Sequence, residues 1–206
     1  MLVTDPEGFT TSQEYDAFGR VLTYDDQKSE RTTYGYDGTH SQPTSILHPD
    51  GATEQFEYNL WGLPTKTIDE LGHETVNTYR DNGLLEMITD ANGGETAFTY
   101  DNRNQLETIT DPVGNTTTYA YDDAGRVVQE IGQLGGQRSY EYDAADRLTR
   151  VTDRNGRVRE FTYDRVGNVT EQRWYDDTGS LVRTTGTSYD EVYNLTHITD
   201  PRASAY

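Results

Sequence analysis

The residues of this 206-residue chain best suited to bind a transition metal are its four histidines, His40, His48, His73 and His197. None of them stands in a spacing such as His-x-x-x-His, which places two imidazoles on one zinc ion. Cysteine is absent, so thiolate metal sites and disulfides are excluded. The sequence therefore predicts no metal site and no cofactor.

Carboxylates are abundant, but their spacing does not define a site. Asp90 with Asn92, and Asp153 with Asn155, resemble the start of a calcium-binding loop. Both pairs lack the downstream bidentate glutamate of such a loop, so a role in turns explains them better. Neither a Ser-His-Asp set nor a carboxylate pair can be singled out for catalysis, because turns place aspartate throughout the chain. We therefore expect a protein that is not an enzyme.

A repeat close to 21 residues long is the main feature of the sequence. Each unit has an aromatic residue, a spacer and a tyrosine, and aspartate most often follows. Consecutive tyrosines of this kind lie 21 or 22 residues apart except in the last interval of 26, which holds an insertion around 174–179. The structural repeat anchors are Tyr15, Asp16, Tyr36, Asp37, Tyr58, Tyr79, Tyr100, Asp101, Tyr121, Asp122, Tyr142, Asp143, Tyr163, Asp164, Tyr189 and Asp190. No break in composition divides them, so a single array of nine units over residues 1–206 is expected, with Tyr206 outside every repeat position.

Residues 96–116 illustrate the local structure that each unit predicts. Phe98 and Tyr100 are two residues apart, so their rings share one face of a strand. The segments 101–104 and 111–114 are rich in Asp, Asn, Gly and Pro and predict turns. Between them Leu106 and Ile109 are three residues apart, which requires a bulge or burial on both faces of the second strand. Each unit thus predicts two short strands, two tight turns and no helix.

The predicted fold class is all-β, with tandem repeats of about 21 residues forming a coiled antiparallel β-meander, because strand twist coils a narrow ribbon. The tyrosines are expected to form a buried ladder, so replacing Tyr121 by alanine should cost about 3–5 kcal/mol. The end strands, placed at Gln13 to Asp16 and at Leu195 to Asp200, lack lysine and mid-strand proline. Edge-to-edge self-association of the isolated chain follows from these unprotected edges.

Charge and hydropathy exclude two further classes of function. The 17 basic residues are outnumbered by 36 acidic ones, so no basic surface is available for nucleic acid. No apolar run approaches the length of a membrane helix, and the first 20 residues do not form a signal peptide.

The motif Tyr-Asp-x-x-Gly-Arg, present at residues 15–20 and 121–126, resembles the YD repeat of Rhs proteins. The resemblance extends over nearly the whole chain. Some units depart from the motif: Asn59 and Arg80 replace the aspartate, and Asn104-Gln105 replaces Gly-Arg. Asparagine meets the same turn chemistry as glycine, so this drift is compatible with the family.

The Rhs/YD-repeat family includes Rhs-type polymorphic toxins, toxin-complex C components, wall-associated proteins and teneurins. The resemblance implies a β-strand spiral shell, which in the bacterial toxins encloses a C-terminal toxin domain. Those toxins self-cleave near an Asp-Pro-x-Gly sequence after the shell. Asp111-Pro112-Val113-Gly114 matches these letters but occupies a turn position in the middle of the array, so no catalytic role carries over.

The function implied is a non-enzymatic structural segment of shell wall that would enclose or carry a toxin. Its partners would be flanking repeats and the enclosed toxin domain, within a longer bacterial protein that is secreted or at the cell surface. The alternative is an adhesion module that binds cell-surface glycans through exposed tyrosines and Asx turns. Covered aromatic rings favour the wall, whereas exposed rings favour glycan binding.

Overall fold

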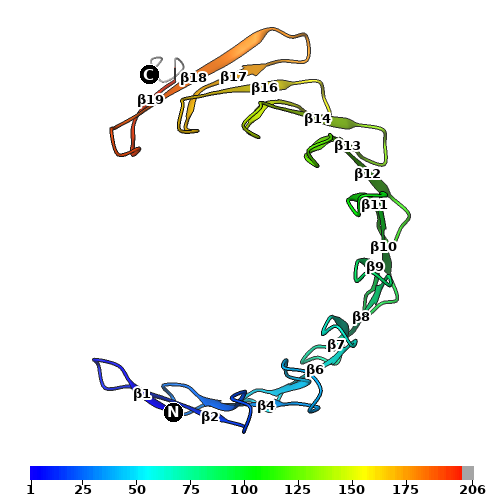
Figure 1. The fold of residues 1–206 in the computed structure, drawn as a ribbon, viewed down its shortest axis with the longest axis vertical. Coiled ribbons are helices and arrows are strands. Elements are labelled where there is room, and N and C mark those ends of the chain that lie inside the picture. Colours follow the sequence, from blue (N-terminus) through cyan, green and yellow to red (C-terminus); the bar gives the residue numbers. More distant parts are fainter. Residues whose placement is uncertain (201–206) are drawn as a thin grey trace. The chain divides into compact units, whose positions relative to one another are not determined.

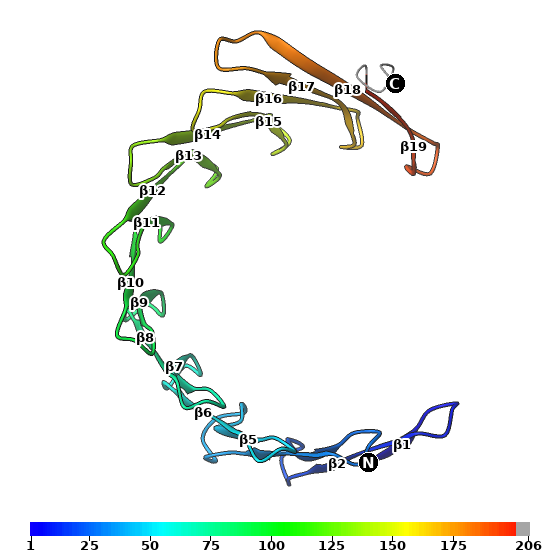
Figure 2. The ribbon, with the colours of Figure 1, turned by 180° about the vertical axis from the view of Figure 1, so that it is seen from behind.

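The computed structural model describes residues 1–200, which form nineteen strands and no helix. The strands follow one another as hairpins along the chain (Figures 1 and 2). Accordingly, this part of the chain has no helix capable of spanning a membrane. Tyr206 lies outside the described residues.

The chain forms two compact units. The first comprises Met1–Phe98 and Asp111–Val113, and the second comprises Thr99–Thr110 and the residues from Gly114 onward. The strands up to the boundary are β1 (Leu2–Thr4), β2 (Thr10–Tyr15), β3 (Val21–Asp25), β4 (Arg31–Gly35), β5 (Ser45–Leu47), β6 (Thr53–Tyr58), β7 (Pro64–Ile68), β8 (Glu74–Tyr79), β9 (Leu85–Thr89) and β10 (Glu95–Tyr100). The remaining strands are β11 (Leu106–Thr110), β12 (Thr116–Tyr121), β13 (Val127–Ile131), β14 (Gln137–Tyr142), β15 (Leu148–Thr152), β16 (Val158–Tyr163), β17 (Val169–Tyr175), β18 (Leu181–Tyr189) and β19 (Leu195–Thr199).

Pairing within each unit is antiparallel between consecutive strands, as in β2–β3 and β3–β4 of the first unit and β12–β13 and β13–β14 of the second. The predicted all-β meander of 21-residue repeats is therefore confirmed. The expected N-terminal edge is wrong, because Gln13 lies in β2, which is covered by β1 through the pair Leu2↔Ser12. The end strand is β1, which no sequence signal distinguished from a disordered terminus.

A bulge in the second strand of the unit explains the three-residue spacing of the apolar side chains. Tyr79 pairs with Leu85, whereas Thr78 pairs with Met87, so one extra residue lies between the two partners. The shift places Leu85 and Ile88 on the same face, because their partners Tyr79 and Asn77 are two apart. The same shift recurs at Tyr121, Tyr142 and Tyr163, as the sequence predicted.

Neither unit has a conventional hydrophobic core. Among residues 1–200 no hydrophobic side chain is fully buried, and the single buried residue is Thr185, at 7% exposed. Tyr121 is only half-buried, so the expected deep ladder is wrong and its replacement by alanine should cost less than 3 kcal/mol. Anchor tyrosines of successive units lie two strands apart, about 10 Å, which is too far for their rings to stack.

Candidate functional site

The turns that begin at the residue after each anchor tyrosine, here called the YD turns, have one recurring geometry. At 122–126 the backbone N–H of Asp122 donates to the carbonyl of Arg126 at 3.0 Å, and that of Gly125 donates to the carbonyl of Asp122 at 3.0 Å. Gly125 has φ of 85°, a left-handed conformation in which a side chain is strained. The arrangement is a three-residue hairpin loop with a G1 bulge, which explains the glycine of the motif.

The aspartate of the motif caps the same turn. Oδ1 of Asp122 accepts hydrogen bonds from the backbone N–H groups of Ala124 and Arg126, each at 3.0 Å. The side chain and backbone N–H of Arg126 both bond this carboxylate and hold its pKa below the usual value. At Asp37 the backbone N–H and then the side chain of His40 lower the pKa to about 2. These carboxylates remain ionised acceptors at neutral pH and cannot serve as general acids.

The arginine of the motif links one unit to the next. Nε of Arg126 donates to Oδ2 of Asp122 at 2.8 Å, and Nη1 donates to the backbone carbonyl of Asp143 in the next YD turn at 3.1 Å. The same guanidinium lies 4.8 Å from the ring centroid of Tyr142, a cation–π contact. Arg20 over Tyr36 (4.2 Å) and Arg147 over Tyr163 (4.8 Å) repeat this contact. Guanidinium groups therefore cover the rings where the sequence predicted a ladder of aromatics.

Units that lack this arginine keep an inter-unit contact by other means. Gln105 Nε2 donates to the carbonyl of Gly125 in the next YD turn at 3.1 Å. The His40 ring is hydrogen-bonded through Nε2 to the carbonyl of Asn59 at 3.0 Å, and its centroid lies 5.4 Å from that of Tyr58. The contact between successive units thus survives changes in the chemistry of the residue that makes it.

The anchor tyrosines contact the unit before them. Their hydroxyl groups donate to a backbone carbonyl 15 residues earlier at 2.6–2.9 Å, in the pairs Tyr36–Val21, Tyr58–Pro43, Tyr79–Pro64, Tyr121–Leu106, Tyr142–Val127 and Tyr163–Leu148. Burial raises the pKa of the Tyr121 phenol, so it remains a donor at neutral pH. The anchor residues are therefore brought together as a repeated structural contact rather than as a catalytic set. Of the anchors, Tyr15 is the most open, at 43% exposed.

The Asx residues considered as calcium ligands or as a cleavage site form turns. Asp90 Oδ1 accepts from the N–H groups of Asn92 and Gly94, each at 2.8 Å. Asp153 Oδ1 accepts in the same way from Asn155 and Arg157, and Asp111 Oδ1 accepts from Val113 at 3.0 Å. The prediction that these positions are turns is confirmed.

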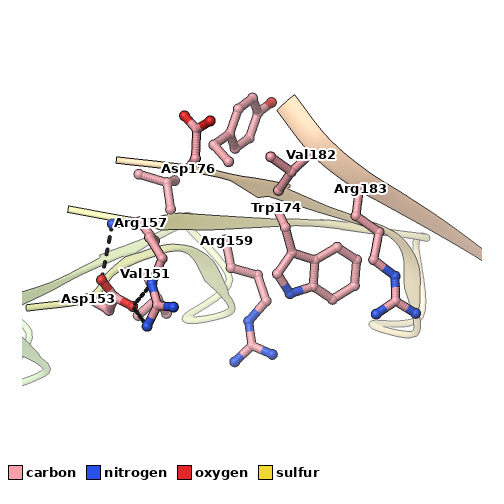
Figure 3. Close-up of a pocket in the computed structure, with 10 residues that line it drawn as sticks. Val151, Asp153, Arg157, Arg159, Trp174, Asp176, Val182 and Arg183 are labelled. Atoms are coloured by element: carbon pink, nitrogen blue, oxygen red, sulfur yellow. Dashed lines mark hydrogen bonds and ion pairs between the residues drawn. The ribbon is translucent and has the colours of Figure 1, made fainter. Parts of the chain in front are cut away.

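The long interval after Tyr163 creates a different surface. β17 is two residues longer than β15, and β18 is three longer than β16, which accounts for the five extra residues. Arg159 pairs with Trp174, and Trp174 pairs with Arg183, so the three side chains form one row across three strands. Figure 3 shows them on the same side of the strands.

This Trp174 row borders a hollow of about 430 Å³. Arg183 lies 4.8 Å from the Trp174 ring centroid and forms an ion pair with Asp200, while Arg157 is paired with Asp153 at 2.7 Å. Arg159 lies 5.2 Å from the ring of Phe161. In a chain of net charge −19 such a gathering of arginines is unusual. The sequence signalled the insertion but not the row, because the row depends on strand register.

A second cluster was missed by sequence reasoning, which expected no metal-binding residues. His48, Glu54 and Glu70 place one nitrogen and two carboxylate oxygens within 4.8 Å of one another. These residues are 6 and 22 positions from His48, a spacing set by the 21-residue repeat rather than by a local motif. The available signal was His48 itself, which stands where most units have aspartate.

The comparisons with known proteins agree with the repeat chemistry. The RHS Repeat family matches residues 79–116, 103–138, 121–158 and 142–173. The chain belongs to the Rhs/YD-repeat family.

Two relatives are informative. A stretch of 65 residues, 32% of this chain and 4% of the relative, is 37% identical to the "Double-stranded DNA deaminase toxin A" of Burkholderia cenocepacia (strain H111). The crystal structure of TcdB2-TccC3-TEV matches 98% of this chain and 12% of its own chain, with a TM-score of 0.79 and 20% identity. The second match shows that the fold is shared. The chain spans only a small part of both proteins.

Proposed function

We propose that this chain is a non-enzymatic length of shell wall that encloses or carries a C-terminal toxin domain of a longer, secreted or cell-surface bacterial protein. The observation that carries the proposal is the contact of each YD turn with the next, made by Arg126 and its equivalents. These contacts hold hairpins side by side without a second layer of protein. A sheet built in this way can extend as a barrier of any length.

The exposed apolar side chains at the turn tips support flanking repeats as partners. Phe18, Leu60 and Trp61 lie in YD turns and are 84%, 94% and 63% exposed. Leu71 and Leu134, in the turns on the opposite edge of the ribbon, are 81% and 96% exposed. Apolar residues exposed in two such rows indicate surfaces that another segment covers. In a shell, that segment would be a neighbouring stretch of repeats.

Limited proteolysis of the longer natural protein tests the proposal. If the repeats enclose the C-terminal domain, that domain should resist protease until the repeats unfold, whereas the domain expressed alone should be cleaved quickly. Replacing Arg20, Arg126 and Arg147 together by glutamine should remove three inter-unit contacts and speed cleavage of the enclosed domain. Cleavage at the same rate with and without the repeats would overturn the proposal.

Glycan binding is a second candidate, and the Trp174 row is the observation that favours it. The anchor tyrosines are engaged by backbone carbonyls and do not present free ring faces, so they do not support it. An indole between two guanidinium groups instead suits an acidic saccharide, through ring stacking and charge. Saturation-transfer NMR with acidic and neutral oligosaccharides tests this, with Trp174→Ala as the variant and Trp61→Ala as the matched control. Equal signals from both variants would refute a site at Trp174.

A further inference from the structure

The turns on the edge opposite the YD turns, here called the distal turns, share one capping position that His48 breaks. The first residue of these turns is Asp5, Asp26, His48, Asp69, Asp90, Asp111, Gly132, Asp153 or Asp176. His48 keeps the turn, since its N–H donates to the carbonyl of Ala52 at 2.9 Å. Asp50 Oδ1 accepts from the N–H of Ala52 at 3.0 Å, a capping bond that the first residue makes in the other turns. The imidazole is thus released from capping.

The released imidazole lies between two carboxylates from different parts of the first unit. His48 Nε2 is 2.8 Å from Oε1 of Glu54 on β6 and 3.1 Å from Oε1 of Glu70 in the next distal turn. The side chains are 27%, 29% and 48% exposed, so the cluster is partly shielded and still open to entry. Two carboxylates converging on one nitrogen need a positive charge among them, from a proton on the imidazole or from a cation.

We propose that His48, Glu54 and Glu70 form a binding site for a divalent transition-metal ion, with Zn²⁺ as the best match. One imidazole nitrogen and two carboxylate oxygens are donors that zinc accepts, with bonds of about 2.0–2.2 Å. Around a tetrahedral ion of that bond length, donor atoms lie about 3.3 Å apart. The 2.8 and 3.1 Å separations therefore need to widen by only a few tenths of an ångström. Water completes the coordination.

Such an ion would join two successive distal turns. Glu70 belongs to the turn after β7, while His48 and Glu54 flank the turn before β6. The ion would thus supply, at the distal edge of the ribbon, the inter-unit contact that Arg126 supplies at the YD edge. The surrounding carboxylates, Glu30 and Asp50, add negative charge beside the cluster and favour a dication over a single proton.

Isothermal titration of the metal-stripped chain with ZnCl₂, in excess MgCl₂ to suppress general attraction to acidic residues, tests the proposal. We expect one tight site per chain and a loss of affinity of at least tenfold in His48→Gln and in Glu70→Gln. His73→Gln is the matched control, because His73 occupies the next distal turn and contacts a single carboxylate, Asp69, at 2.9 Å. Cobalt(II) absorption in the visible range gives a second readout of the ligand set.

The outcomes are distinct. Loss in His48→Gln and Glu70→Gln, with retention in His73→Gln and unchanged circular dichroism in all three, supports the site. Unaltered binding in His48→Gln, or equal loss in His73→Gln, overturns it, as does binding that excess Mg²⁺ abolishes. If a variant unfolds, loss of the cobalt spectrum of the wild-type chain between pH 7 and 5, where His48 competes for a proton among Glu30, Asp50, Glu54 and Glu70, is the deciding measurement. An absent spectrum at pH 7 overturns the proposal.

Discussion

Replacing Tyr142 in two steps separates the contributions of its hydroxyl and its ring. Tyr142→Phe removes the hydrogen bond to the carbonyl of Val127, 2.9 Å long, and should cost about 1 kcal/mol. Tyr142→Ala also removes a half-buried ring, which adds about 1–1.5 kcal/mol as half of the value for full burial. The site is open to water, so no cavity forms. Loss of the Arg126 contact adds further to the alanine cost, for a total of about 2–3 kcal/mol.

Urea unfolding followed by circular dichroism measures both changes as differences in the free energy of unfolding. Tyr15→Phe and Tyr15→Ala are matched controls, because Tyr15 is 43% exposed and donates to Gln13 Oε1 rather than to a backbone carbonyl. Both should be smaller than their counterparts at Tyr142. Equal costs for Tyr142→Phe and Tyr142→Ala would show that the ring contributes nothing. A cost above 4 kcal/mol for Tyr142→Ala would show that the ring is deeply buried, and would refute the reasoning.

Three further predictions concern the turns and edges. Gly125→Ala should destabilise the chain by about 1–2 kcal/mol in the same assay, because φ is 85°, whereas Gly136→Ala, with no positive φ, should be close to neutral. Thermal stability should fall as pH drops from about 4 to about 2, because Asp37, with a folded pKa of about 2, takes up protons more readily when unfolded; a melting temperature that stays flat to pH 2 would contradict this. The chain should associate edge to edge through β1 and β19 as salt is raised, since repulsion is screened beyond about 8 Å; light scattering of a monomer at both low and high salt would contradict this.

The fold was predictable because its determinants are local and repeated. Alternation around Phe98 and Tyr100, the Asx-Gly turns and the three-residue spacing of Leu85 and Ile88 each specify a piece of one hairpin, bulge included. Repetition then specifies the meander. The depth of burial was not predictable, because it depends on whether a second layer covers the sheet. Nothing in a single 21-residue unit encodes that layer.

The candidate sites were less predictable, since both arise between units. The Trp174 row requires the register of β16, β17 and β18, which the insertion shifts by an amount that only the pairing reveals. The His48 cluster requires Glu70 from the following unit. Arg126 presents the same problem, because its local bond to Asp122 is implied by the motif while its contact with Tyr142 is not. Aligning the sequence by unit, rather than by local motif, brings these residues into adjacent rows.

The acidity of the chain follows from its turns rather than from any partner. Two turns per unit are capped mainly by aspartate, and ionised Asp side chains are the best acceptors for the two N–H groups of each loop. Arginine four residues later neutralises only some of them, as at Asp122 and Asp153. The remaining charge lies along both edges of the ribbon, where neighbouring stretches of a shell would have to meet. Assembly against this repulsion therefore needs a local attraction at the edges, which the exposed Leu60 and Leu134 and a cation at His48 would provide.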